Sequence, residues 1–240
     1  MNILAVTILI LYAYLDLFVF GYPAQAEELK LNPERTVLLV GPIVPPSLAA
    51  NTELILLAGG SKEPIDIVIN SPGGYVTVGL RIISTIEHVK AQGITVRCFV
   101  PEYAASMAFQ ILLHCSERHA LDMSQLLFHR VRVMIGMGAV LTGPDANALA
   151  RDLLLMDRAL FSDIKDHLNM PLKWLKYHFD AETFHIATNL CKQDPEFITC
   201  HRSVGGLLPS LIGAAESHDN SVPTDSTMIY MTPSVERGVQ

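Results

Sequence analysis

Three short apolar segments between residues 65 and 129 constrain the fold of this chain more than any other feature. Each has the length and apolar character of a strand, and small or polar residues follow it. Residues 65–69 lead to Gly73-Gly74, residues 96–100 lead to Ser106, and residues 126–128 lead to His129. These strand ends would supply backbone N–H groups, a hydroxyl and an imidazole. Such groups are the donors for an oxyanion, the nucleophile and the base of a serine hydrolase.

The segments around these three continue an alternation of strands and helices. Residues 36–41 form an apolar run stopped by Gly41-Pro42, which predicts a strand. A helix is expected to open at Pro45-Pro46-Ser47, with Ser47 as its cap, and to close at Gly59-Gly60. The next helix is indicated by the four- and three-residue spacing of Val78, Ile82, Ile86 and Val89, and Gly93 ends it. A helix over 104–113, starting around Ser106, and a strand within 120–128 complete the pattern. This alternation predicts an α/β fold with mostly parallel strands joined by right-handed crossovers.

The second half of the chain is expected to be mainly helical. Residues 131–143 are predicted to form a loop beside the site, and Pro144 begins a long helix with one apolar face that ends before Asn169-Met170-Pro171. A shorter helix through Trp174 and Tyr177 follows. Residues 184–190 fit a strand or a short helix equally well. Residues 203–240 are rich in Ser, Gly, Pro and Thr and are predicted to be a disordered tail, so the main domain is placed at residues 27–202.

The N-terminus bears on the compartment in which the protein works. Residues 3–20 are almost wholly apolar, and Ala24-Gln25-Ala26 follows as a small-x-small site. This layout predicts a signal peptide at residues 1–26, cleaved after Ala26. The alternative is an uncleaved membrane anchor, since about 18 apolar residues can just span a bilayer. Both interpretations place Glu27 onward outside the cytoplasm, in a periplasmic or secreted protein.

Export would allow the four cysteines to form disulfides. We expect the pairs Cys98–Cys115 and Cys191–Cys200, with buried free thiols as the alternative. No Cys-x-x-Cys or His-x-x-x-His pair with zinc spacing is found, so neither a metal site nor a cofactor is expected. The formal net charge is −7 and there is no basic run, which argues against a nucleic-acid partner.

Each part of the proposed hydrolase has a purely structural alternative. Ser106 could be only a helix N-cap, the Gly73-Gly74 pair only a turn, and His129 a structural histidine. The three in this order and spacing are much less probable by chance.

The same residues resemble the proteolytic subunit of the Clp protease (ClpP), within the wider crotonase-like superfamily. The resemblance covers roughly residues 36–190, and three motifs carry it: Asn70-Ser71-Pro72-Gly73-Gly74, Ala104-Ala105-Ser106-Met107-Ala108 and Phe128-His129. It implies a repeated ββα core with Ser106 as the nucleophile and His129 as the general base. It also implies an oxyanion hole formed by the N–H groups of Gly74 and Met107, with Ser71 and Gly73 beside the bound substrate. The implied reaction is amide hydrolysis through an acyl-enzyme.

Two residues are candidates for the acid that would complete the triad. Aligned without gaps from Leu172 to Phe184, the family's aspartate position falls on Glu182, whereas Asp180 would need a shift of two residues. A site with neither acid, acting as a dyad or inactive, is the third possibility.

The sequence also departs from the family pattern. Pro101-Glu102-Tyr103 replaces the small residues usual before the nucleophile, Arg130-Val131 replaces the usual Gln-Pro, and residues 131–143 resemble the family's oligomer-forming handle only in position.

Taken with the predicted export, the resemblance leads us to expect an extracytoplasmic, ATP-independent serine endopeptidase acting on peptides or unfolded proteins. A homo-oligomer is possible and an ATPase partner improbable. The alternative is an inactive peptide-binding or scaffold protein that kept the fold.

Overall fold

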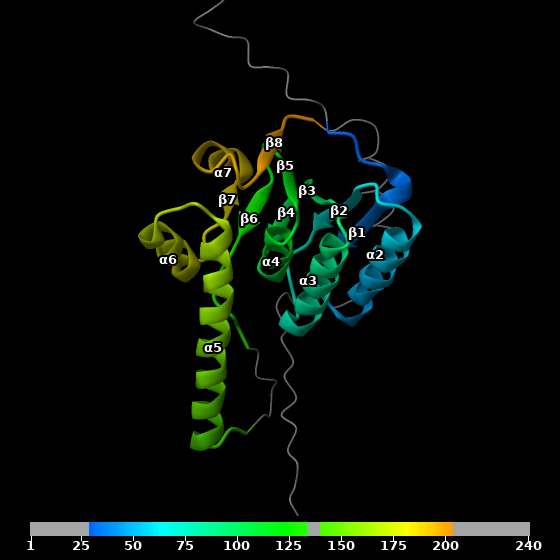
Figure 1. Ribbon diagram of the computed structural model, residues 1–240. Coiled ribbons are helices and arrows are strands. Elements are labelled where there is room, and N and C mark those ends of the chain that lie inside the picture. The colour runs from blue at the N-terminus through cyan, green and yellow to red at the C-terminus, as the bar shows by residue number, and fades with distance from the viewer. Residues whose placement is uncertain (1–28, 134–139, 204–240) are drawn as a thin grey trace, which may run out of the picture.

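The structure, a computed structural model, describes residues 29–133 and 140–203. Its centre is a five-stranded, wholly parallel sheet in the order β1-β2-β3-β5-β8 (Figure 1). The strands are β1 (Thr36–Val40), β2 (Ile65–Asn70), β3 (Val96–Val100), β5 (Glu117–Leu121) and β8 (Thr199–His201). Every residue of β2 is buried, as expected for a central strand covered on both faces.

A second sheet of three short strands carries the segments next to Ser106 and His129. It contains β4 (Tyr103–Ala105), β6 (Gln125–Leu127) and β7 (His185–Ile186), with β6 between the other two. Strand β4 runs parallel to β6, and β7 runs antiparallel to it. A bridge between Ser71 and Ala104 links this sheet to the chain leaving β2.

Three helices cover one face of the large sheet (Figure 1). They are α2 (Ala49–Gly60), preceded by the 3-10 helix η2 (Pro45–Leu48), α3 (Val76–Ala91) and α4 (Met107–Leu113). The apolar positions of α3 fall on one side because they recur at helical spacing, and that side joins the main core. All seven residues of α4 are buried.

The opposite face of the sheet has a smaller apolar cluster. Leu29 and Leu31, in the segment before the 3-10 helix η1 (Pro33–Arg35), pack there against Val68 and Phe99. The same segment is fixed by the fully buried Asp66, which accepts hydrogen bonds from the backbone N–H of Asn32 at 2.9 Å and from Arg97 Nε at 2.7 Å.

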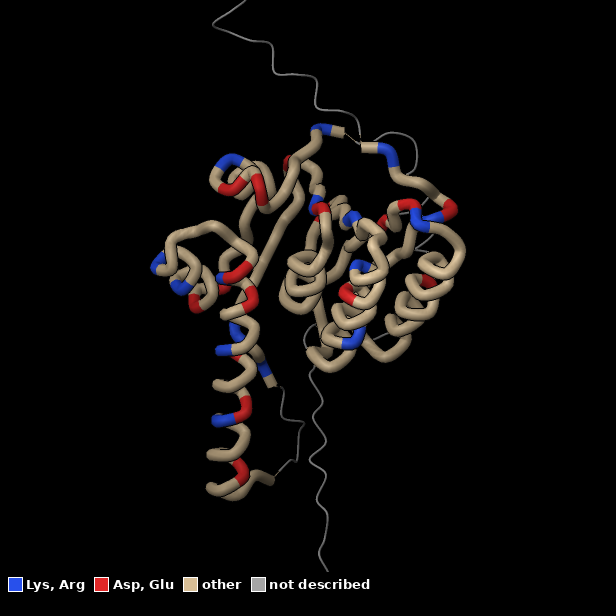
Figure 2. Tube along the Cα trace, viewed as in Figure 1, with Lys and Arg blue, Asp and Glu red and all other residues tan. Residues whose placement is uncertain are grey.

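Helix α5 (Gly143–His167) is the longest element, and its first half projects from the body (Figure 1). It begins with a capping box, in which Thr142 Oγ1 accepts from the N–H of Asp145 and the Asp145 carboxylate accepts from the N–H of Thr142. Figure 2 shows acidic and basic residues interleaved along it. Only its second half packs closely, through Ile164. After it come α6 (Leu172–Ala181) and α7 (Ala187–Gln193).

The prediction of a mixed α/β fold with a mostly parallel sheet is confirmed, and several boundaries differ. The predicted helix over 104–113 is wrong at its start, because Ala104 and Ala105 lie in β4 and the helix begins at Met107. The strand expected within 120–128 is two strands in different sheets, β5 and β6. Residues 184–190 contain both alternatives, β7 followed by the start of α7.

Other details of the sequence analysis also change. Ser47 does not cap an α-helix: it lies in η2, and its Oγ accepts from the N–H of Val44, the residue before η2. The predicted apolar face of α5 is only partly buried, and strand β8 was not predicted. The predicted signal peptide or anchor (1–26), residues 134–139 of the predicted loop and nearly all of the predicted tail lie outside the described residues. Among the helices that are described, none combines the length and the apolarity needed to cross a bilayer.

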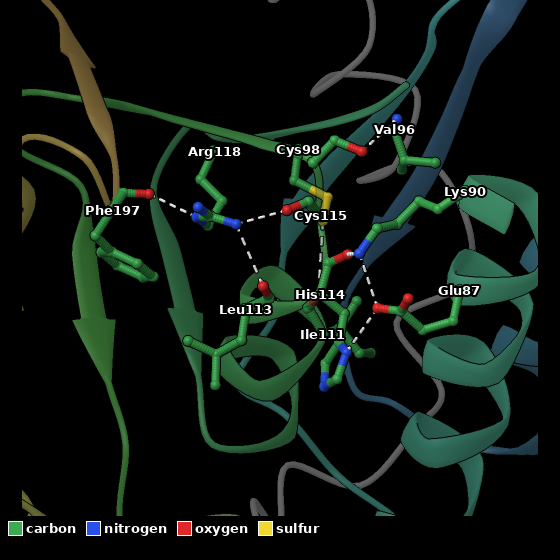
Figure 3. The surroundings of a disulfide bond; sticks show 11 residues. Glu87, Lys90, Val96, Cys98, Ile111, Leu113, His114, Cys115, Arg118 and Phe197 are labelled. Carbon is green, nitrogen blue, oxygen red and sulfur yellow. Dashed lines mark hydrogen bonds and ion pairs between the residues drawn. A yellow bond between two sulfur atoms is a disulfide. The ribbon is translucent and has the colours of Figure 1, made fainter. Parts of the chain in front are cut away.

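The structure contains two disulfides, and they are the predicted pairs. Cys98 in β3 is bonded to Cys115, and Cys191 in α7 is bonded to Cys200 in β8. Figure 3 shows the first of them between the sheet and the end of α4, beside Arg118, which donates to the carbonyl oxygens of Leu113 and Cys115. This bond ties β3, which precedes Ser106 in the chain, to the far end of α4, which follows Ser106.

Removing this buried disulfide should destabilise the protein without changing the fold. For a closed segment with a sequence separation of 17 residues, loop entropy predicts a loss of about 3 kcal/mol in the free energy of unfolding. The measurement is urea denaturation of the Cys98→Ala/Cys115→Ala double variant. The Cys191→Ala/Cys200→Ala variant, with a separation of 9 residues, is the control and should lose slightly less. Equal stability of wild type and the first variant would contradict this expectation.

Candidate active site

Ser106 occupies a sharp turn between β4 and α4. Its φ and ψ are 56° and −121°, values that residues other than glycine rarely adopt. Three contacts hold this conformation: the N–H of Ser106 donates to the carbonyl of Leu127 at 2.8 Å, its carbonyl accepts from the N–H of Gln110 at 3.2 Å, and the neighbouring Ala105 donates to Ser71 O at 3.0 Å. Strained turns of this kind are frequent at functional sites, where a strand–turn–helix junction presents a nucleophile.

Two glycines after β2 lie directly against this turn. Gly73 has φ +92°, and a Cβ built on it would lie 2.7 Å from Ser106 Cβ and 2.9 Å from Met107 N. A Cβ on Gly74, with φ +155°, would lie 2.3 Å from the carbonyl oxygen of Ile43. Both positions therefore require glycine, both for backbone freedom and for close approach.

The N–H groups of Gly74 and Met107 are the predicted oxyanion donors. Met107 is the first residue of α4, so its N–H has no acceptor within the helix. The bridge between Ile43 and Gly74 uses the carbonyl of Gly73 and the N–H of Tyr75, and it leaves the N–H of Gly74 without a backbone acceptor among the described residues. Ser71 is fully buried, and its Oγ accepts from the N–H of Gly73, which stabilises the turn.

His129 is anchored by the residue before it. Phe128 is buried, and its ring contacts those of Phe109 and His185 with centroids 5.3 and 5.5 Å apart. The His129 side chain is only 7% exposed. Its Nδ1 lies 2.5 Å from the carbonyl oxygen of Arg130, and a carbonyl can only accept, so Nδ1 carries the proton and Nε2 is free to accept one.

One cavity brings four of the predicted residues together. It is lined by Gly74, Ser106, Met107 and His129, together with Val76, Gln110, Arg130, Val131 and Leu160. The predicted nucleophile, base and oxyanion donors thus line one cavity, although they come from segments far apart in sequence. Among the described residues, no hydrogen bond joins Ser106 Oγ to His129.

The two candidate acids lie in different ion pairs. Glu182, the C-cap of α6 in a left-handed conformation, has its Oε1 3.8 Å from His129 Nδ1. The same carboxylate pairs with Arg132 through both oxygens. Asp180 instead pairs with Arg130 Nη2 at 2.6 Å. Of the two, Glu182 is the carboxylate that lies beside the imidazole.

Sequence reasoning missed the groups that hold the segment after His129. Buried Asp157, on α5, accepts from Arg130 Nη1 at 2.9 Å and from the N–H of Val131 at 2.7 Å. Gln110 lines the cavity with 3% of its surface exposed, and its Oε1 has no hydrogen-bond partner among the described residues. Asp157 lies at helical spacing from apolar residues, and this position could have indicated a buried ion pair. The sequence could not have indicated that Arg130 is its partner.

The environment of His129 sets its protonation. Burial lowers the pKa of His129 below its ordinary value, and the nearby charge of Arg132 lowers it further. The hydrogen bond to the Arg130 carbonyl and the charge of Asp157 oppose this shift. His129 is therefore neutral at pH 7, the form in which an imidazole can take a proton.

The departures from the family pattern have structural partners. Glu102 Oε2 accepts from Asn70 Nδ2 at 3.0 Å, which joins the segment before Ser106 to the end of β2. Arg130 and Arg132 make the ion pairs with Asp157, Asp180 and Glu182 described above.

Comparison with known proteins identifies the family of this chain. A sequence model of the family described as Clp protease matches residues 25–192, more than half of the chain. The chain is also 31% identical, over 150 residues, to the ATP-dependent Clp protease proteolytic subunit 2 of Chlamydia pneumoniae, covering 60% of this chain and 70% of that protein. The chain belongs to the Clp protease family of serine peptidases.

Proposed function

We propose that this chain is an active serine endopeptidase that hydrolyses peptides and unfolded protein segments without ATP, outside the cytoplasm. The observation that carries the proposal is the shared cavity of Ser106, His129, Gly74 and Met107. Membership of the Clp protease family supports the reaction class.

The residues have the following roles in the proposed reaction. Ser106 Oγ attacks the peptide carbonyl while His129 Nε2 takes its proton, and the N–H groups of Gly74 and Met107 stabilise the oxyanion. His129 then gives the proton to the leaving amine. In the second half, His129 takes a proton from the water that attacks the acyl-enzyme and returns it to Ser106 Oγ as the acid product leaves. An extended substrate can add to the backbone beside Gly73 by strand-like pairing.

Glu182 is proposed as the acid that orients His129. Glu182→Gln should lower kcat by about 10²–10⁴-fold, because the imidazolium formed during the reaction loses its neighbouring charge. Asp180→Asn is the matched control. It should change kcat by less than about fivefold, since it removes only a partly exposed ion pair with Arg130. Steady-state kinetics on a fluorogenic peptide measures both, and equal losses in the two variants would exclude the assignment of Glu182.

The lowered pKa of His129 predicts the pH dependence of the reaction. A general base acts in its neutral form, so kcat/KM should fall only as the pH drops through a pKa below the ordinary value of histidine. Arg132→Gln should move this inflection to higher pH, because the charge of Arg132 lowers the pKa of His129. An inflection above pH 7 in the wild type, or no movement in the variant, would contradict the role of His129.

Independence from ATP and a location outside the cytoplasm are further parts of the proposal. Two disulfides support an oxidising compartment, and the apolar residues 3–20 support export. The experiment is hydrolysis of an unfolded, fluorescently quenched protein by the purified chain with and without ATP, and equal rates are expected. Hydrolysis that requires ATP and a second protein, or an uncleaved chain confined to the cytoplasm of its source cell, would contradict these parts.

A homo-oligomer is proposed from the projecting half of α5. Leu154 and Leu155 are 51% and 61% exposed there, on a helix whose first half lies away from the body (Figure 1). Burial of these side chains against a second copy would remove apolar surface from water. Sedimentation should show an assembly larger than the monomer, and Leu154→Glu/Leu155→Glu should dissociate it; a monomeric wild type would exclude it.

A second candidate function is a non-catalytic, peptide-binding or scaffold protein. Two observations favour it: Ser106 Oγ makes no hydrogen bond to His129, and the Glu182 carboxylate is engaged by Arg132. Serine-dependent turnover of any peptide would eliminate this candidate, whereas peptide binding without turnover would support it.

A further inference from the structure

We propose a zinc-type metal site formed by His114, Asp163 and His167, remote from the catalytic cavity. His114 follows the last residue of α4, and the other two lie one turn apart on α5. One ligand atom from each residue can be chosen so that all three lie within 4.8 Å of one another.

The distances between these atoms suit a bound ion. His114 Nε2 lies 3.1 Å from Asp163 Oδ2. His167 Nδ1 lies 3.3 Å from Asp163 Oδ1 and donates to the main-chain carbonyl oxygen of Asp163 at 2.8 Å, a hydrogen bond that an ion bound at Nδ1 would replace. Tetrahedral zinc, with ligands at 2.0–2.2 Å, places neighbouring ligand atoms about 3.3 Å apart. A metal ion would take the place of the proton between His114 Nε2 and Asp163 Oδ2 and of the proton that His167 Nδ1 donates to the Asp163 carbonyl.

His114 also has the outer partner typical of a metal-bound histidine. Its Nδ1 lies 3.0 Å from Glu87 Oε1 on α3, so a carboxylate orients the ring while Nε2 points to Asp163. Lys90 fixes this arrangement, since its Nζ donates to Glu87 Oε1 and to the carbonyl of His114, both at 2.8 Å (Figure 3). A carboxylate–histidine pair of this kind sets the tautomer and the orientation of a metal ligand.

The donor set indicates the class of ion. Two imidazoles and one carboxylate suit Zn²⁺ and neighbouring transition ions, whereas Mg²⁺ and Ca²⁺ prefer oxygen ligands. The three side chains are between 17% and 31% exposed, which lets an ion enter and lets water complete its coordination.

The position of the site gives it a structural consequence. Ser106 and His114 lie at opposite ends of α4, so the two sites are separate. A bound ion would tie the second half of α5 to the end of α4, with Glu87 of α3 behind it. The ion would therefore fix α4, which follows Ser106, against α5, which carries Asp157.

The test is calorimetric titration of the chelator-treated full chain with Zn²⁺, supported by the visible absorption of bound Co²⁺. The wild type should bind one ion tightly, and His114→Gln and His167→Gln should each weaken binding by at least about tenfold. Glu87→Gln keeps all three ligands and should weaken binding about 10–100-fold, as expected for an outer partner.

Two controls separate this site from other histidines. His88→Gln, an exposed residue of α3, and His201→Gln, whose Nε2 lies 3.0 Å from His119 Nδ1 in the large sheet, should leave the affinity unchanged. Circular dichroism without metal checks that each variant is folded. Two results would overturn the proposal. One is a folded double variant, His114→Gln/His167→Gln, that binds Zn²⁺ as tightly as the wild type. The other is a wild type that binds no Zn²⁺.

Discussion

Replacing Ser106 by alanine is expected to lower peptide hydrolysis by at least about 10⁴-fold, because the variant has no oxygen to form the acyl-enzyme. The fold should persist, since the Ser106 side chain makes no cap hydrogen bond and the turn is held by backbone bonds. The measurement is kcat/KM on a fluorogenic peptide together with the urea midpoint of the variant.

The matched control is Ser84→Ala, an exposed serine on α3, which should keep full activity. Some hydrolysis can remain in Ser106→Ala, because the oxyanion donors still stabilise direct attack by water. Such a low residual rate is compatible with the mechanism. Activity of Ser106→Ala within tenfold of the wild type would show that another residue is the nucleophile.

Replacing Gly73 by alanine is expected to damage both stability and activity. The new Cβ would lie 2.6 Å from Ala105 O and 2.7 Å from Ser106 Cβ, and the backbone has φ +92°. Overpacking and left-handed strain together should lower the free energy of unfolding by roughly 2–5 kcal/mol. Because the clash is with the nucleophile turn, activity should be lost even where the variant remains folded.

Gly93→Ala is the matched control for Gly73→Ala. Gly93 has a similar φ, +79°, but a Cβ there would meet no atom within 4 Å. It should therefore show the backbone cost alone, about 1–2 kcal/mol, with unchanged activity. Urea denaturation and peptide hydrolysis of both variants make the comparison, and equal effects would contradict the close packing of Gly73 against Ser106.

The parallel core could be predicted because its signals are local. The buried strand at 65–69 and the helical spacing from Val78 to Val89 are both visible in the sequence, and both elements form. The predicted helix over 104–113 includes Ala104 and Ala105, and alanine favours helices. They form a strand because Ala104 pairs with Leu126 and bridges Ser71, contacts that are distant in sequence.

The same contrast holds for the site. Ser106, His129 and the glycine turn could be predicted because each follows a recognisable strand, and the structure places them at one cavity. Asp157 and Arg132 could not be predicted as neighbours of the site. Their positions depend on how α5 and α6 pack, and on long-range ion pairs that leave no periodic pattern in the sequence.

The most direct measurement of the central claim is labelling of the purified chain with a serine-reactive fluorophosphonate, followed by mass spectrometry of the adduct. Ser106 should carry the adduct in the wild type, Ser106→Ala should not label, and His129→Ala should label far more slowly. Equal, weak labelling of the wild type and Ser106→Ala, or an adduct on a different serine, would contradict the assignment of this cavity as a serine peptidase site.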